Sequence, residues 1–414
     1  MAFEYTPCQK KAFELLLKWW KSSSKQYFVL AGYAGTGKSS IVKDLIDELA
    51  KQGRGSSNNL YGDLAGLSEF LDTGNGKFSV KYVTFTGKAS QVLRRKGLPA
   101  TTIHKLIYQP VEKNNRVEFI LKPASDLAMI DLIVVDEASM ITKKMFRDLL
   151  SFNIPMILLG DLGQLPNTEN DGFNIMEEYD TFMTSITRQG LDSPIIQLSM
   201  MAREGKPIKN KIYGDGVMKA SISRISMNAL LRGDQIICAK NDTRIKLNNL
   251  CRTHLGHDDS PYPVEGDKIL CRKNNYDSGL INGMIGTCNS DSSNIIESMG
   301  SLSFGFDAPE DNVSGYFDSS IRHFHPEVCQ SIIEVAPHFD KELDRFDYGF
   351  AITGHASQGS QYEYPIIIDE AFGDEAFRRK LKYTMYTRAI SKLVILEGSV
   401  DQLIRKINAT KNSK

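Results

Sequence analysis

Residues 32–39 of the chain read Gly-Tyr-Ala-Gly-Thr-Gly-Lys-Ser, which fits the G-x-x-x-x-G-K-[ST] pattern of a P-loop. The apolar run 27–31 precedes this stretch and predicts a buried strand, while residues 40–49 show helical periodicity. The glycines let backbone N–H groups curl round a phosphate, and the helix N-terminus favours its negative charge. A strand, loop and helix in this order predict a site for a nucleoside triphosphate rather than an ordinary turn.

Within the P-loop, the Lys38 amine is expected to reach the β- and γ-phosphates, and the Ser39 hydroxyl to ligate Mg²⁺. The stretch expected to surround the nucleotide comprises Gly32, Ala34, Gly35, Thr36, Gly37, Lys38, Ser39 and Ser40.

Length and composition limit the number of domains, the partners and the compartment that can be expected for this chain. A chain of 414 residues predicts two or more domains. Lys plus Arg equals Asp plus Glu at 50 each, a balance that still permits a local basic groove and therefore neither indicates nor excludes nucleic acid. The sequence has no long apolar run and no signal peptide, which predicts no membrane association. Its six cysteines lack metal-ligand spacing, so we expect reduced thiols in a cytoplasmic protein.

Two later strands end in residues suited to nucleotide chemistry. The apolar run 128–135 leads into Asp136 and Glu137, at the position where open α/β sheets bind ligands. Asp136 would hold Mg²⁺, and Glu137 would orient or deprotonate the attacking water. The strand 155–159 leads to Gln164, whose amide could sense the γ-phosphate, although an ordinary loop has the same pattern.

Other strand ends suit contacts to a single-stranded backbone and its bases. The strand 80–85 runs into a Thr-Gly-Lys-Ala-Ser segment, and Thr-Thr-Ile-His follows at 101–104. Each segment could equally be a helix cap or a turn. Residues 107–126 alternate around two asparagines and predict a hairpin, and 264–340 predict a small all-β insert.

The remaining elements complete an α/β pattern. Residues 52–78 read as a surface insertion without chemistry. A strand is expected at 348–353, where the α/β pattern resumes after the insert, and a final helix is expected to carry 383–389.

Taken in order, eight stretches resemble one family. They are GYAGTGKS, TFTGKAS, TTIH, VVDEAS, GDLGQLP, TRQ, ITGHASQGSQ and YTRA. The set resembles the superfamily 1 DNA helicases of the RecD/Dda-like branch, whose members move 5′ to 3′, and the resemblance runs from Gln9 to about Leu396. The family usually has Lys where Ala356 stands.

The resemblance implies an α/β fold with two RecA-like parallel-sheet domains, a β-hairpin insert and a small SH3-like all-β insert. The implied domains are 1A (1–106 and 127–187), the pin 1B (107–126), 2A (188–265 and 341–414) and 2B (266–340).

The resemblance also implies roles for single residues, with ATP and Mg²⁺ as cofactors. Gln9 would read adenine, Gly359 would lie at the nucleotide, and Arg188 and Arg388 would reach the γ-phosphate from the second domain. The residues implied to grip single-stranded DNA are Thr84, Phe85, Lys88, Thr102, His104, Thr353, His355 and Ser357. Tyr108 or Phe119 would form the wedge of the pin, and the sequence does not choose between them.

Three functional hypotheses follow. The first is an ATP-dependent DNA helicase that moves 5′ to 3′ as a monomer on single-stranded DNA and on tailed duplexes. It would act in a bacterium or phage-infected cell, with replication or recombination proteins as candidate partners. The second is a single-strand translocase or RNA-directed NTPase that does not unwind. The third, a P-loop kinase or nucleotide switch, leaves Glu137, Gln164 and the two arginines unexplained.

Overall fold

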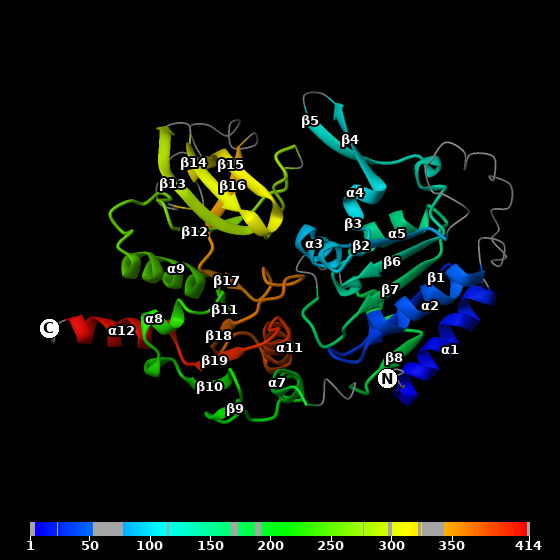
Figure 1. Ribbon diagram of the computed structural model, residues 1–414, viewed down its shortest axis with the longest axis horizontal. Coiled ribbons are helices and arrows are strands. Elements are labelled where there is room, and N and C mark those ends of the chain that lie inside the picture. Colours follow the sequence, from blue (N-terminus) through cyan, green and yellow to red (C-terminus); the bar gives the residue numbers. More distant parts are fainter. Residues whose placement is uncertain are drawn as a thin grey trace. The chain divides into compact units, whose positions relative to one another are not determined.

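The computed structural model describes residues 5–22, 24–52, 78–113, 116–166, 173–186, 192–275, 277–296, 300–321, 324 and 343–411. The chain divides into two compact units, Met1–Gln197 and Leu198–Lys414 (Figure 1). Residues 53–77, which make up nearly all of the predicted surface insertion, lie outside the described residues. In the described part of the chain no helix is long and apolar enough to cross a membrane.

The first unit is built on a six-stranded sheet in the order β3-β2-β6-β7-β1-β8. Its strands are β1 (Tyr27–Gly32), β2 (Val80–Thr84), β3 (Ala100–Thr102), β6 (Leu132–Asp136), β7 (Met156–Gly160) and β8 (Thr181–Met183). Every neighbouring pair in this sheet is parallel. The carboxyl ends of the strands therefore meet at one edge of the sheet.

Helices cover both faces of this sheet. They are α1 (Pro7–Ser22), α2 (Lys38–Gln52), α3 (Gly87–Arg95), α4 (Ile103–Ile107) and α5 (Lys143–Leu150). Alternate residues of β6 enter different cores: Val134 packs with residues of α1 and α2, and Val135 packs with residues of α4 and α5. Burial on both faces explains why these strands read as continuous apolar runs.

The strand predicted at 128–135 begins later than expected. A short 3-10 helix, η4 (Ala124–Leu127), continues into a turn, and β6 starts only at Leu132. Pairing with β2 sets this start, because Leu132 is the residue opposite Val80. Before it, the Asp131 carboxylate accepts the backbone N–H of Ser79 at 2.7 Å and closes that end of the ladder.

The predicted hairpin is confirmed. Strands β4 (Tyr108–Lys113) and β5 (Arg116–Leu121) form a separate two-stranded antiparallel sheet, with Tyr108 opposite Leu121 and Lys113 opposite Arg116.

The second unit has its own six-stranded sheet, in the order β17-β11-β18-β19-β10-β9. The strands are β9 (Ile212–Gly214), β10 (Val217–Ser221), β11 (Gln235–Cys238), β17 (Ala351–Thr353), β18 (Pro365–Asp369) and β19 (Leu393–Glu397). All pairs are parallel except β9 with β10. The helices are α7 (Pro194–Arg203), whose first residues belong to the first unit, α8 (Met227–Leu230), α9 (Asn241–Leu255), α11 (Glu375–Tyr386) and α12 (Val400–Lys411).

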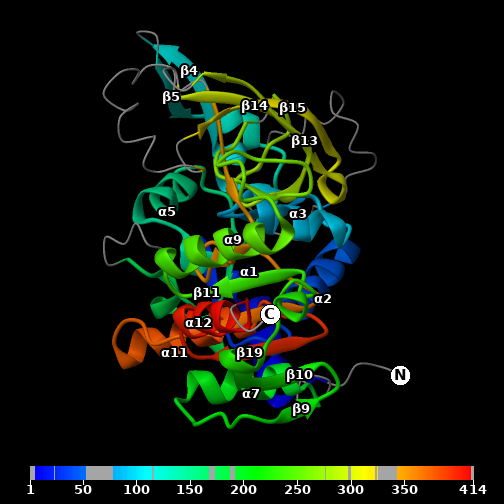
Figure 2. The ribbon, with the colours of Figure 1, turned by 90° about the vertical axis from the view of Figure 1, so that its left-hand side faces the viewer.

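The predicted all-β insert is a closed five-stranded barrel. It consists of β12 (Lys268–Cys271), β13 (Ile285–Ile296), β14 (Ser301–Ala308), β15 (Val313–Ser320) and β16 (Asp344–Tyr348). Phe304, Phe306 and Phe346 fill its interior, with ring centroids 5.1 Å apart for Phe346 and each of the others. Figure 2 shows β13, β14 and β15 running side by side. The likeness to SH3 domains stays a prediction.

The strand predicted at 348–353 is wrong, because it divides into two. The barrel strand β16 ends at Tyr348, and β17 begins at Ala351 in the parallel sheet. The break falls at Gly349, where a Cβ would lie 2.9 Å from the backbone carbon of Ile269. This close approach needs glycine. Because β16 belongs to the barrel, the barrel extends beyond the predicted limit at residue 340.

Candidate nucleotide and nucleic-acid sites

The P-loop glycines are required by the backbone geometry. Gly35 and Gly37 have φ angles of 76° and 84°, in the left-handed region that glycine enters without cost. Gly32 has no such φ, but a Cβ there would lie 2.9 Å from the Cβ of Met183. The Thr36 hydroxyl donates to the carbonyl oxygen of Tyr33 at 2.8 Å and closes the loop.

The Lys38 amine lies inside the curve of this loop. It donates to the carbonyl oxygens of Gly32 at 2.6 Å and Tyr33 at 3.0 Å. Helix α2 begins at Lys38, so Ser39 and Ser40 lie in its first turn, where the helix dipole favours an anion. A cationic amine, a helix N-terminus and two left-handed glycines are the features that a triphosphate requires, and the loop fits that group.

Gln9 connects α1 to the P-loop. Its side chain is buried, with the amide nitrogen donating to the Thr36 carbonyl oxygen at 3.1 Å. The amide oxygen accepts the backbone N–H of Thr6 at 2.9 Å. Both ends of the amide therefore bind protein atoms, and its predicted contact with adenine stays a prediction.

The predicted acidic pair lies at the carboxyl end of β6, whose last residue is Asp136, two strands along the sheet from β1. The Asp136 carboxylate accepts the backbone N–H of Glu137 at 2.9 Å. Glu137 has a φ of 54°, a left-handed conformation that is unusual for a residue with a side chain and recurs at functional sites. On the adjacent strand β2, burial, aided by the charges of Asp47 and Asp136, raises the pKa of Tyr82 to about 12.

Gln164 lies in the loop that follows β7, the strand between β6 and β1. Its backbone N–H donates to the carbonyl oxygen of Asp161 at 3.2 Å. The buried carboxylate of Asp161 accepts the backbone N–H of Gly163 at 2.8 Å. The loop is thus held to the sheet edge by a tight turn, and Gln164 is 9% exposed.

The DNA candidates of the first unit lie at the carboxyl ends of β2 and β3, at the other end of the same sheet edge. Two of their hydroxyls act inside the protein: Thr84 donates to the Thr86 carbonyl oxygen at 2.7 Å, and Thr102 caps α4 by accepting the N–H of Lys105 at 3.1 Å. A cap was the alternative open for the 101–104 segment. The remaining candidates here are Phe85, partly buried on the core, Lys88, and exposed His104.

The DNA candidates of the second unit lie at and just after the carboxyl end of β17. Ser357 is fully buried and donates to the Gly354 carbonyl oxygen at 2.7 Å. The Thr353 hydroxyl accepts the N–H of Ala356 at 3.3 Å, and Gly359 has a left-handed φ of 75°. Burial lowers the pKa of the His355 imidazole, which keeps the ring neutral at neutral pH.

The two predicted arginines differ in what the structure describes. Arg188 lies outside the described residues. Arg388 follows α11 and is 4% exposed, with its Nε donating to the Thr384 carbonyl oxygen at 3.0 Å and another nitrogen donating to Ser360 O at 3.4 Å. Its role at the γ-phosphate stays a prediction.

One aromatic group was missed by sequence reasoning. The ring of Phe377 stacks on His355 with centroids 6.0 Å apart, and exposed Phe372 packs edge-on against Phe377. Two phenylalanines five positions apart after a strand were the available signal, but each also fits an ordinary helix start.

The fold and the site together define a P-loop NTPase with two parallel-sheet units. The AAA domain model matches residues 4–217, and the chain belongs to that family. The UvrD-like helicase C-terminal domain model matches residues 348–396. The resemblance to the superfamily 1 helicases of the RecD/Dda-like branch is confirmed.

Two curated relatives carry that confirmation. The chain is 28% identical over 228 residues to the ATP-dependent DNA helicase dda of Enterobacteria phage T4, covering 52% of this chain and 46% of the relative. It is 23% identical over 394 residues to the ATP-dependent RecD2 DNA helicase of Deinococcus radiodurans, covering 87% of this chain and 45% of the relative. The chain thus spans less than half the length of these relatives.

A solved structure confirms the fold. Bacteroides Pif1 bound to ssDNA matches with a TM-score of 0.53 and 16% identity, over 99% of this chain and 98% of that one. The RecA-like architecture of both units is therefore confirmed.

Proposed function

We propose that this protein is an ATP-dependent DNA helicase that moves 5′ to 3′ on single-stranded DNA and unwinds duplexes with a single-stranded tail. The proposal rests above all on the order of groups along one sheet edge. The P-loop, Gln164 and the Asp136–Glu137 pair lie at the carboxyl ends of β1, β7 and β6, and the DNA candidates lie at those of β2 and β3. Nucleotide and polymer contacts thus share one rigid sheet, which can couple them.

The nucleotide end of the edge supports ATP hydrolysis. When ATP binds, the Lys38 amine would donate hydrogen bonds to phosphate oxygens in place of the two loop carbonyl oxygens. An ammonium group can donate to either kind of acceptor. Mg²⁺ would be held by the Ser39 hydroxyl and Asp136, where it offsets phosphate charge. Glu137 would accept a proton from the attacking water. Arg188 and Arg388 would stabilise the transition state, an effect worth about 10³–10⁵ in rate in other NTPases.

The polymer contacts would turn nucleotide turnover into movement. Lys88 and His104 of the first unit and His355 of the second would hold the strand, with bases stacking on Phe85. If the two units release the strand at different stages of ATP turnover, each turnover advances the protein by one directional step.

The hairpin supplies a candidate wedge, and the structure favours one of the two predicted residues. Phe119 is 57% exposed. Tyr108 is 6% exposed, and its hydroxyl donates to the Asp148 carboxylate. We therefore assign the wedge to Phe119, because a ring must be accessible to stack on a base pair at the fork.

Three measurements test this function. Lys38→Ala should abolish ATP hydrolysis that depends on single-stranded DNA, because the charge that binds the phosphates is lost. Single-stranded DNA should stimulate ATP hydrolysis more strongly than RNA of equal length. Equal or greater stimulation by RNA, or hydrolysis without strand separation, would favour the alternative of a translocase or RNA-directed NTPase. Sedimentation of the protein on tailed DNA should show a monomer.

A further inference from the structure

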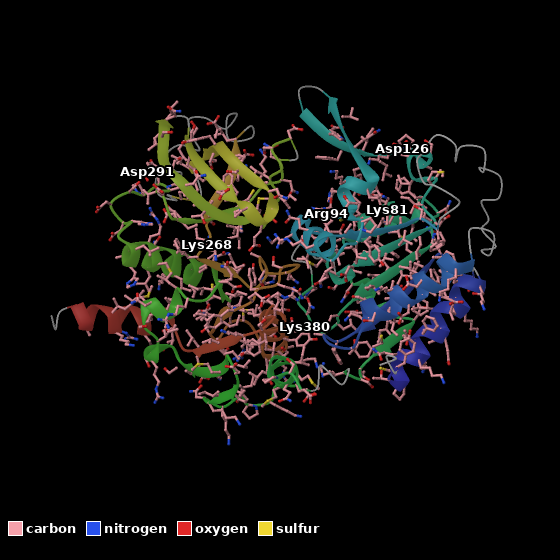
Figure 3. The ribbon with its side chains drawn as sticks, viewed as in Figure 1. Lys81, Arg94, Asp126, Lys268, Asp291 and Lys380 are labelled. Carbon is pink, nitrogen blue, oxygen red and sulfur yellow. The ribbon has the colours of Figure 1, made fainter. Side chains whose placement is uncertain are left out.

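The second unit contains a pocket that the proposed helicase mechanism does not use. Its volume is about 450 Å³, within the range of small-ligand sites. The walls come from the segment after α7, from the carboxyl ends of β18 and β19, from β10 and from α11. Figure 3 marks Lys380 on α11, the residue after Arg379.

Cations outnumber carboxylates in this pocket. Lys206, Lys219, Arg378, Arg379 and Lys382 line it, against Asp369, Glu375 and Glu397. The difference, five minus three, is two among the lining residues, and Lys206 also pairs with Glu204, at 2.7 Å.

Each carboxylate of the pocket already has a cationic partner within it. Asp369, which is 7% exposed, lies 2.8 Å from the Lys382 amine and 3.8 Å from the Lys219 amine. Glu397 lies 3.1 Å from Lys219, and Glu375 pairs with Arg379. The carboxylates are therefore occupied by partners, which weakens their repulsion of an incoming anion.

The two arginines keep donors for such an anion. Among the described residues no acceptor bonds the buried Nε of Arg379. The Nε of Arg378 donates to its own helix, to the Asp374 carbonyl oxygen at 3.3 Å, so its remaining guanidinium nitrogens can turn toward a ligand. A buried donor without an acceptor is costly, and an anion would relieve that cost.

A glycine provides room for the Arg379 guanidinium. Gly205 ends α7 with a φ of 70°, and a Cβ there would lie 2.5 Å from the Nε of Arg379. The guanidinium thus occupies the space that a Cβ at 205 would take, so any other residue at 205 would displace it. Another lining residue, Lys219, is held in place by donating to the Ile208 carbonyl oxygen at 3.1 Å.

We propose that this pocket binds a phosphate group, as a second anion site separate in sequence from the P-loop. Planar guanidinium groups match the oxygens of phosphate in pairs, and lysine amines supply further charge. The phosphate could come from a free compound such as pyrophosphate or from the backbone of nucleic acid. This inference does not rest on the helicase function.

Binding of pyrophosphate to the 414-residue chain with Lys38→Ala tests the proposal by calorimetry, because that variant removes the main cation of the P-loop. We expect binding that Arg379→Gln weakens by roughly tenfold or more. Arg379→Lys should restore only part of the affinity, since an amine cannot form the paired bonds. Gly205→Ala should weaken binding as well, by displacing the guanidinium.

Arg405→Gln is the matched control, because Arg405 is exposed on α12 and its Nε donates to the carbonyl oxygen four residues earlier, at 3.3 Å, as in Arg378. A second outcome is that pyrophosphate does not bind, but Arg378→Gln/Arg379→Gln weakens the binding of an oligonucleotide and lowers the salt dependence of that binding. In that case the phosphate group that the pocket binds comes from the nucleic-acid backbone. The proposal is overturned if neither ligand responds to the pocket variants, or if Arg405→Gln has the same effect. Melting temperatures show whether each variant is folded.

Discussion

Gly35→Ala isolates the contribution of backbone conformation to ATP binding. Gly35 has a φ of 76°, and an added Cβ would lie 3.5 Å from Ile196, an ordinary van der Waals contact. The substitution therefore introduces no clash. It imposes the cost of a left-handed residue, about 1–2 kcal/mol. If the loop of the variant leaves this conformation when no nucleotide is bound, the cost appears on ATP binding as a loss of about five- to thirtyfold in affinity.

Gly97→Ala is the matched control for this effect. Gly97 has a φ of 80°, and an added Cβ there would have no atom within 4 Å. The backbone cost is thus the same, but it falls at the end of α3, away from the P-loop. Titration of both variants with ATP and Mg²⁺ should show weakened binding for Gly35→Ala alone, with a lower melting temperature for Gly97→Ala. Equal affinities for ATP in both variants would refute the assignment of the phosphate cradle to Gly35.

Three further predictions concern the proposed wedge residue and two residues predicted to contact DNA. Phe119→Ala should lower duplex unwinding by roughly tenfold through lost base stacking, with ATPase activity retained, whereas Ile120→Ala, on the other face of the hairpin, should leave unwinding unchanged in a strand-displacement assay. Thr102→Ala should lower the free energy of unfolding by about 1 kcal/mol, measured in urea, and Thr102→Ser should restore it, because serine also caps a helix; an unchanged stability would contradict the cap. Burial lowers the pKa of His355. Its contribution to the free energy of unfolding is therefore present above the unfolded pKa of about 6.5 and is lost as pH falls through the folded value. His355→Gln should flatten the dependence of the free energy of unfolding on pH below a pH of about 6.5, and an unaltered dependence would contradict this.

Much of the fold was predictable because the strands are buried on both faces. Continuous apolar runs such as 155–159 and the strand before the P-loop are signals that local periodicity detects. Turn chemistry also marked the hairpin at 107–126. Element ends were less predictable, since the start of β6 depends on its pairing with β2, and the division at Gly349 depends on backbone contact with β12. Neither contact is local in sequence.

The loops that form the candidate site were predictable from the sequence, but the hydrogen-bond partners of their hydroxyl groups were not. Thr84 and Ser357 occur in stretches that suggest DNA contact, yet their hydroxyls donate to carbonyl oxygens of the protein. A hydroxyl that closes a turn and one that meets a phosphate look alike in a sequence, because the difference is only the direction of the side chain. The same holds for Phe119 and Tyr108, which burial separates.

Unwinding of two tailed duplexes tests the central claim most directly. The substrates share one duplex and differ only in whether the single-stranded tail is 5′ or 3′, and strand release is measured with ATP and Mg²⁺. The helicase account predicts release from the 5′-tailed substrate, little from the 3′-tailed one, and none from either with Lys38→Ala. Release from the 3′-tailed substrate alone would contradict the direction of movement. ATP hydrolysis without release from either substrate would contradict the helicase function itself.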